Sequence, residues 1–196
     1  MPNLTDFFYN KTNLCRSNIY IETGTYLGYG VKNMLDKYSF IHSIELSEKW
    51  YNYNVEQFKD NNKVKIHLGD SKNILPSLLS NINEPVTIYL DAHYSGVHTE
   101  FGEEETPLLK ELEILKNREY DDIIIIDDCR ILGQKGVSGR ENDDIYPLTN
   151  YDWTDITEEK ILSLMKPNYL LLKNTNYEYI KYHRNDQYVL AKNNVL

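Results

Sequence analysis

The feature that most constrains the fold is an alternation between short β-branched runs and segments with helical spacing of apolar residues. The expected strands are 19–22, 40–46, 64–68, 86–93 and 122–128, and the expected helices are 31–37, 48–59, 72–79, 107–117 and 157–165. The run at 122–128 is the most apolar, as a central strand covered on both faces should be. This alternation predicts an α/β fold with a doubly wound, mostly parallel sheet, right-handed crossovers and helices on both faces.

The last third of the chain departs from this alternation. Residues 130–153 are polar and carry three glycines and a proline, which is too long for a plain connection, so we expect an active-site loop or lid over 130–156. Three further strands, 169–172, 177–182 and 187–191, are joined by Asn-rich turns and predict an antiparallel end to the sheet. We expect one domain over 1–196, in which 1–17 form an N-terminal extension.

Composition narrows the class of protein. The 196 residues carry a formal net charge of −9, which disfavours nucleic acid as a partner. The two cysteines, Cys15 and Cys129, are too few and too far apart for a disulfide framework or a zinc knuckle. The sequence has neither an apolar run of membrane-spanning length nor a signal-peptide pattern, so we expect a soluble, cytoplasmic protein with no membrane partner. The oligomeric state is left open.

A glycine-rich turn follows the first expected strand. Gly24, Gly28 and Gly30 allow positive φ and close approach of the backbone to a ligand, at the junction where open α/β sheets bind cofactors. The spacing G-x-x-x-G-x-G differs from the G-x-G-x-x-G of dinucleotide-binding enzymes. A tight turn that binds no ligand is the alternative interpretation.

Acidic residues recur at the carboxyl ends of the expected strands. They are Glu22, Glu45, Asp70, Asp91 with His93, and Asp127 with Asp128. Because these ends share one edge of a parallel sheet, the residues should converge there. Glu45 follows Gly24 by 21 positions, the separation at which an acid reaches ribose hydroxyls. Asp70 is placed either to accept a hydrogen bond from an adenine amine or to cap the next helix.

Taken together, several motifs resemble a little-characterised group of class I S-adenosylmethionine (SAM)-dependent methyltransferases, often found near sugar-modification genes. The motifs are Glu22-Thr-Gly-Thr-Tyr-Leu-Gly, Ser43-Ile-Glu-Leu-Ser, Gly69-Asp-Ser, Leu90-Asp-Ala-His-Tyr-Ser, Thr106-Pro-Leu-Leu-Lys-Glu-Leu and Ile126-Asp-Asp-Cys-Arg. The resemblance implies a Rossmann-like, seven-stranded sheet with an antiparallel C-terminal strand. It also implies that SAM is bound by Glu22, Gly24, Thr25, Gly28, Glu45, Asp70 and Ser71.

A looser resemblance is to the metal-dependent O-methyltransferases of the macrocin type. That family places one Asp after the fourth strand and an Asp pair after the fifth around Mg²⁺, and Asp91, Asp127 and Asp128 match it. Three carboxylates suit Mg²⁺ or Mn²⁺. The family's second Asp after the fourth strand is replaced here by His93, which we expect to act with Asp91 as the catalytic pair and to serve as the base. Capping, or pairing with Arg130, is the alternative role for Asp127 and Asp128.

The function expected from the sequence is methyl transfer from SAM to a hydroxyl of a small molecule, such as a sugar or nucleotide-sugar, with help from a divalent metal. An NAD-dependent oxidoreductase and a non-catalytic, cofactor-binding partner subunit are the alternatives. The sequence does not identify the acceptor or distinguish O- from N-methylation.

Overall fold

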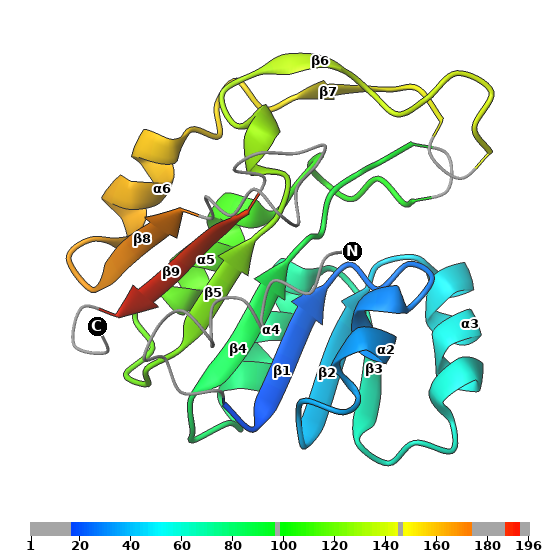
Figure 1. The fold of residues 1–196 in the computed structure, drawn as a ribbon, viewed down its shortest axis with the longest axis vertical. Coiled ribbons are helices and arrows are strands. Elements are labelled where there is room, and N and C mark those ends of the chain that lie inside the picture. The colour runs from blue at the N-terminus through cyan, green and yellow to red at the C-terminus, as the bar shows by residue number, and fades with distance from the viewer. Residues whose placement is uncertain (1–16, 97–98, 145–146, 174–186, 193–196) are drawn as a thin grey trace.

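A seven-stranded sheet forms the centre of the molecule (Figure 1). The structure is a computed structural model, described here for residues 17–96, 99–144, 147–173 and 187–192. The strand order is β3-β2-β1-β4-β5-β9-β8. Five strands are parallel: β1 (Ile19–Thr23), β2 (Phe40–Glu45), β3 (Val64–Leu68), β4 (Val86–Leu90) and β5 (Ile123–Ile126). Their carboxyl ends lie at one edge, as the acid pattern predicted.

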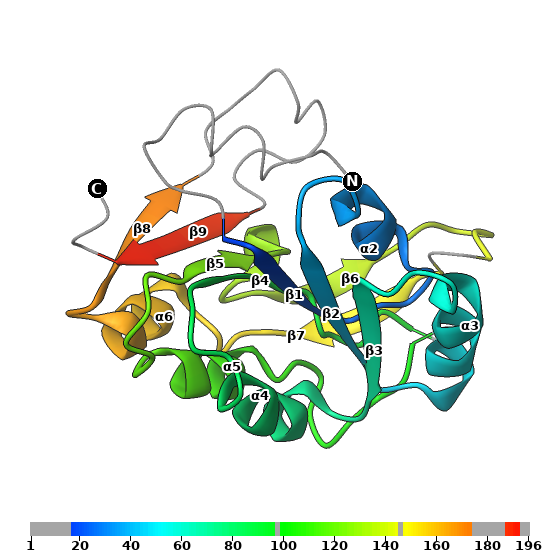
Figure 2. The ribbon, with the colours of Figure 1, turned by 90° about the horizontal axis from the view of Figure 1, so that it is seen from below.

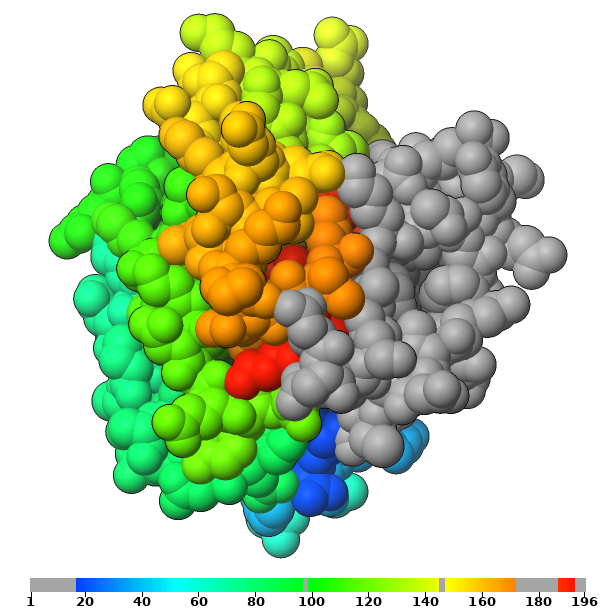
Figure 3. Space-filling model, turned by 90° about the vertical axis from the view of Figure 1, so that its left-hand side faces the viewer, coloured from blue at the N-terminus to red at the C-terminus, as the bar shows by residue number. Residues whose placement is uncertain are grey.

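The two remaining strands complete the sheet beside β5. Strand β9 (Tyr188–Lys192) is antiparallel to both β5 and β8 (Tyr169–Lys173), which confirms the predicted antiparallel C-terminal strand. Residues 188–191 are buried, and only small parts of β9 (red) reach the surface beside β8 and α6 (Glu158–Met165) in Figure 3. The predicted strand 177–182 and most of the extension 1–17 lie outside the described residues.

Helices cover both faces of the sheet, as Figure 2 shows. Helices α2 (Tyr29–Met34) and α3 (Glu48–Phe58) contribute to one apolar cluster, and α4 (Ser71–Leu79), α5 (Leu108–Leu115) and α6 contribute to the other. Side chains of β5 alternate between the clusters, with Ile123 and Ile125 in the first and Ile124 and Ile126 in the second. Each such buried side chain stabilises the fold by about 1.5–3 kcal/mol, and together they hold β5 in place as the last parallel strand of the site-bearing edge.

The segment expected to be a lid contains regular structure. A short 3-10 helix, η1 (Cys129–Ile131), leads into an antiparallel pair, β6 (Lys135–Ser138) and β7 (Thr149–Asp152), which lies beyond the carboxyl ends of β4 and β5 (Figure 1). Ser138, Gly139 and Pro147 border the cleft at that edge. A closing motion of 130–156 stays a prediction.

No helix in the described part of the chain is long and apolar enough to cross a membrane.

Candidate functional site

A cleft of about 370 Å³ opens at the carboxyl ends of the parallel strands. Its volume is in the range of small-molecule and cofactor sites. All the site residues predicted from the sequence line it except Gly28. The edge therefore gathers residues that are up to 106 positions apart, from Glu22 to Asp128.

The glycine turn has two different structural roles. Gly24 has a φ of +83°, and a Cβ on it would lie 2.6 Å from the carbonyl oxygen of Asp91, so the turn packs directly on the end of β4. Gly28 has a φ of +73°, and a Cβ there would lie 2.2 Å from Oδ1 of Asn54 on α3. Gly28 thus allows α3 to approach the turn rather than forming a wall of the cleft.

Glu22 lies beneath the turn. It is 3% exposed, and its Oε1 accepts a hydrogen bond from the Ser43 hydroxyl at 2.7 Å. The Ser43 and Thr25 hydroxyl oxygens are 2.5 Å apart. A Cβ at Gly30 would lie 2.1 Å from Oε2 of Glu22, so a larger residue there would displace the Glu22 carboxylate. Burial raises the pKa of Glu22 to about 8.

Glu45 is held by backbone donors on both sides. Its Oε2 accepts from the Tyr26 amide at 2.7 Å, and its Oε1 accepts from the Ser47 amide at 2.8 Å. Burial raises its pKa, although these backbone hydrogen bonds act in the opposite direction. The rings of Tyr26 and Trp50 pack edge to face, with their centroids 4.8 Å apart, and both rings line the cleft. Binding of ribose hydroxyls by this carboxylate stays a prediction.

Asp70 acts as a helix cap in the structure. Its Oδ1 accepts from the Lys72 amide at 3.2 Å, at the N-terminus of α4. The Lys72 Nζ lies 3.3 Å from Oδ2 of Asp70 and 2.7 Å from Oε2 of Glu103. Capping was one of the two roles that the sequence left open for Asp70, and adenine binding by Asp70 and Ser71 stays a prediction.

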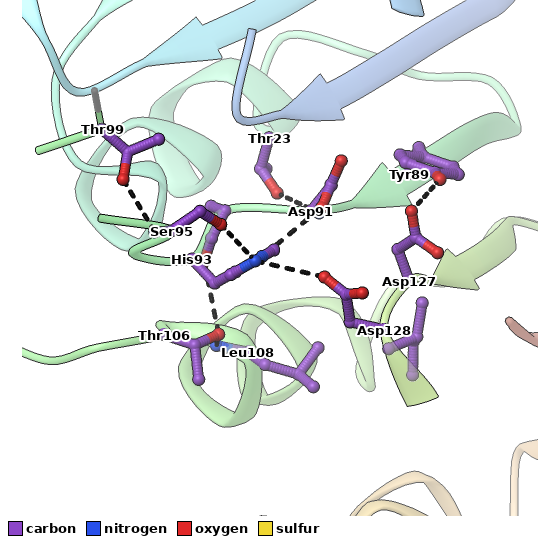
Figure 4. A network of polar contacts seen from close by, with 12 residues as sticks. Thr23, Tyr89, Asp91, His93, Ser95, Thr99, Thr106, Leu108, Asp127 and Asp128 are labelled. Carbon is purple, nitrogen blue, oxygen red and sulfur yellow. Dashed lines mark hydrogen bonds and ion pairs between the residues drawn. The ribbon is translucent and has the colours of Figure 1, made fainter. Parts of the chain in front are cut away.

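The second half of the cleft is built around His93 (Figure 4). Its Nδ1 lies 3.5 Å from Oδ1 of Asp91, and its Nε2 lies 3.1 Å from Oδ2 of Asp128 and 2.6 Å from the Ser95 hydroxyl oxygen. One potential ligand atom from each of Asp91, His93 and Asp128 falls within 4.8 Å of the others. Arg130 Nη1 also donates to Oδ1 of Asp128, the pairing that the sequence offered as an alternative.

The two aspartates after β5 point in different directions. Asp128 has a φ of +54°, a left-handed conformation that Asp tolerates. Asp127 instead accepts from the Tyr89 hydroxyl, which in turn accepts from Nε2 of Gln187 at 2.7 Å. The three-residue group therefore contains His93 where the sequence predicted Asp127, and metal binding by Asp127 stays a prediction without support from this geometry.

Burial and nearby charges shift the pKa values of His93 and Asp127 in this second half of the cleft. Burial lowers the pKa of His93, but hydrogen bonding to Asp91 and the charges of Asp128, Asp91 and Asp127 outweigh burial and raise the pKa to about 9. Burial, followed by the charges of Asp91 and Asp128, raises the pKa of Asp127 to about 8. We expected a base near its ordinary pKa at His93; in the ligand-free protein it holds its proton at neutral pH.

Some site residues were not identified from the sequence. Ser43 and Glu111 both lie within motifs quoted for the resemblance, but nothing in the sequence showed that the hydroxyl would contact Glu22 or that the carboxyl would be buried under Asp91. The sequence offered one signal for both residues: each lies at a position of an amphipathic strand or helix that is expected to face the core.

Comparison with known proteins supports the fold. No protein-family model and no curated protein sequence matches the chain. Solved structures do match: SMU.1697c of Streptococcus mutans, a protein assigned as a methyltransferase and solved in complex with SAH, has a TM-score of 0.58 at 13% identity over 96% of each chain. The SAH-bound methyltransferase PaMTH1 of Podospora anserina has a TM-score of 0.58 at 16% identity, over 89% of this chain and 71% of that one. A SAM-dependent methyltransferase of Clostridium acetobutylicum has a TM-score of 0.54 at 17% identity, over 96% and 89%. The chain has the Rossmann-like fold of class I SAM-dependent methyltransferases.

Proposed function

We propose that this protein is a SAM-dependent methyltransferase that methylates a hydroxyl of a small molecule. The observation that carries the proposal is the junction of two half-sites in one cleft, where the Gly24 turn packs on the end of β4 beside Asp91. One half offers a fixed carboxylate at Glu45, and the other offers an imidazole between two carboxylates. A fold shared with SAH-bound proteins supports the same conclusion. The choice of a sugar or nucleotide-sugar as acceptor rests on the sequence resemblance.

The donor set of the second half fits a divalent cation. Asp91, His93 and Asp128 would supply two carboxylate oxygens and one imidazole nitrogen from atoms within 4.8 Å of one another. Oxygen-rich sites with one imidazole suit Mg²⁺ or Mn²⁺. When bound, such an ion polarises an acceptor hydroxyl and lowers its pKa.

The residues of the chain have separate tasks in this proposal. The Gly24 turn and Glu45 would hold the cofactor in the cleft beside the end of β4. Asp91 orients His93. With a cation bound, His93 would be a neutral ligand and the proton of the acceptor hydroxyl would leave to solvent; without a cation, His93 would take that proton after losing its own. Because the sulfonium already activates the methyl group, the protein contributes mainly alignment of donor and acceptor.

A turnover screen tests the proposal. The purified protein would be incubated with SAM and a panel of nucleotide-linked and free sugars, with EDTA or with added Mg²⁺ or Mn²⁺, and SAH would be quantified by mass spectrometry. We expect SAH to form with at least one acceptor, EDTA to suppress it, and the added ion to restore it. Full activity in EDTA would remove the metal from the proposal.

Binding measurements separate the alternatives. SAM binding without SAH formation across a broad acceptor panel would favour a non-catalytic partner subunit. NAD binding in place of SAM would favour an oxidoreductase, although the glycine spacing and the antiparallel β9 weigh against that class.

A further inference from the structure

One carboxyl group lies in an otherwise apolar helix face below the cleft. Glu111 is 1% exposed on α5, whose other buried residues are Leu108, Leu112 and Leu115. Its Oε1 has no hydrogen-bond partner among the described residues. Burial of a polar group without a partner costs about 1–3 kcal/mol, so an apolar residue there would favour folding.

The surroundings of Glu111 connect it to both halves of the cleft. Burial, with a further contribution from the charges of Asp70 and Asp91, raises the pKa of Glu111 to about 7, although the side chains of Ser71 and Thr23 act in the opposite direction. Thr23 also accepts a hydrogen bond from the Asp91 amide at 3.2 Å, as Figure 4 shows. Glu111 therefore lies where β1, the start of α4 and the end of β4 meet.

A small cavity separates Glu111 from the Asp91–His93 pair. Its volume is about 10 Å³, which is at the lower limit for one water molecule, and Glu111, Asp91, His93 and Thr106 all line it. The ring of Trp153, whose centroid is 5.7 Å from that of His93, forms another part of the wall. A water molecule in this cavity would find a partner in the unpaired Oε1 of Glu111.

We propose that Glu111 is a positioning residue, which fixes the Asp91–His93 pair from below through Thr23 and one buried water molecule. The inference rests on the proposed function in naming that pair as the catalytic one. A buried carboxyl oxygen without a partner lowers the stability of the fold, and this cost is explained if the carboxyl orders the site. An acid that only supports the core would instead stabilise the fold.

The test compares Glu111→Met, Glu111→Gln and Glu113→Met. Met removes the hydrogen-bonding group at similar length, Gln restores it without charge, and Glu113 is an exposed residue on the same helix. The measurements are thermal melting, the ¹⁵N resonances of the His93 ring in the ligand-free protein, assigned with His93→Gln, and the kcat and KM for SAM in the turnover screen.

We expect Glu111→Met to melt at or above the wild-type temperature, to shift the His93 ring resonances and to lower kcat at least tenfold, with KM for SAM within twofold. In Glu111→Gln these values should return towards those of the wild type, and in Glu113→Met they should equal those of the wild type. Unchanged His93 resonances in folded Glu111→Met would overturn the inference, as would a large fall in melting temperature that Gln does not reverse. Because the resonances need neither acceptor nor SAM, failure of the inference is distinguishable from failure of the proposed function.

Discussion

The proposed cofactor half of the cleft, around Gly24 and Glu45, and the proposed acceptor half, around His93, are built by different means. In the cofactor half, the main fixed contacts come from the backbone, since Glu45 is held by two amides and Gly24 packs on a carbonyl group. In the acceptor half, His93 is held by the side chains of Asp91, Asp128 and Ser95. Backbone amides do not titrate, whereas the charges of His93, Asp91 and Asp128 change with every proton or cation that enters or leaves. The first half is suited to holding a constant ligand, and the second to accepting a proton or a cation.

The largest expected effect comes from the residue where the two halves touch. Gly24→Val should weaken SAM binding at least 100-fold, or about 2.7 kcal/mol, because its Cβ would lie 2.6 Å from the Asp91 carbonyl oxygen. Gly133→Val is the matched control: Gly133 also has a positive φ, of +71°, but its nearest neighbouring atom would be 3.6 Å away. Calorimetry on both folded variants measures the difference. Normal SAM binding by Gly24→Val would show that the turn is not part of the site.

A second comparison sharpens the role of the paired aspartates. Asp128→Asn should weaken Mn²⁺ binding about tenfold or more, whereas Asp127→Asn should change it by less than about threefold, because only Asp128 lies in the three-residue group. SAM affinity should change little in either variant. Paramagnetic resonance of titrated Mn²⁺ provides the measurement. An equal loss in Asp127→Asn would restore the ligand set predicted from the sequence.

Within the cofactor half, Glu45→Ala should weaken SAM binding by about 1.5 kcal/mol, or roughly tenfold, the lower end of the range for a hydrogen bond to a charged group. The reason is the loss of a carboxylate that its two amide donors orient towards the cleft. Glu48→Ala, an exposed acid at the start of α3, controls for net charge. If calorimetry shows the same affinity for Glu45→Ala as for the control, Glu45 does not bind the ribose.

The last test measures stability rather than binding, and it concerns pH and the buried Glu22. Its pKa is about 8 in the folded protein against an ordinary 4.5, so the folded state binds the extra proton. The contribution of Glu22 to the free energy of unfolding is therefore fully present below about pH 4.5, and it is lost as the pH rises through 8. Glu22→Gln should flatten this fall, and Glu56→Gln, which changes an exposed side chain, should not. Melting temperatures between pH 5 and 9 provide the test, and identical slopes in wild type and Glu22→Gln would contradict the raised pKa.

The sequence alone determined the architecture and the edge that carries the site. Alternating β-branched and amphipathic segments predicted the parallel sheet, its antiparallel end and helices on both faces, and the structure confirms each. The convergence of Glu22, Glu45, Asp70 and Asp91 also followed, because parallel strands bring their carboxyl ends to a single edge. Period and order are local properties, so the sequence by itself was sufficient to predict them.

Only the tertiary structure decided where each side chain points once a strand has ended. The left-handed backbone of Asp128 directs it to His93, while its neighbour Asp127 contacts Tyr89. The buried Glu111 contributes to the site from beneath because α5 packs under β4, and Asp70 caps α4. The physical reason is that beyond the regular strand a single φ angle reorients a carboxylate. The packing of distant elements sets that angle, so it cannot be predicted from the periodicity of the sequence.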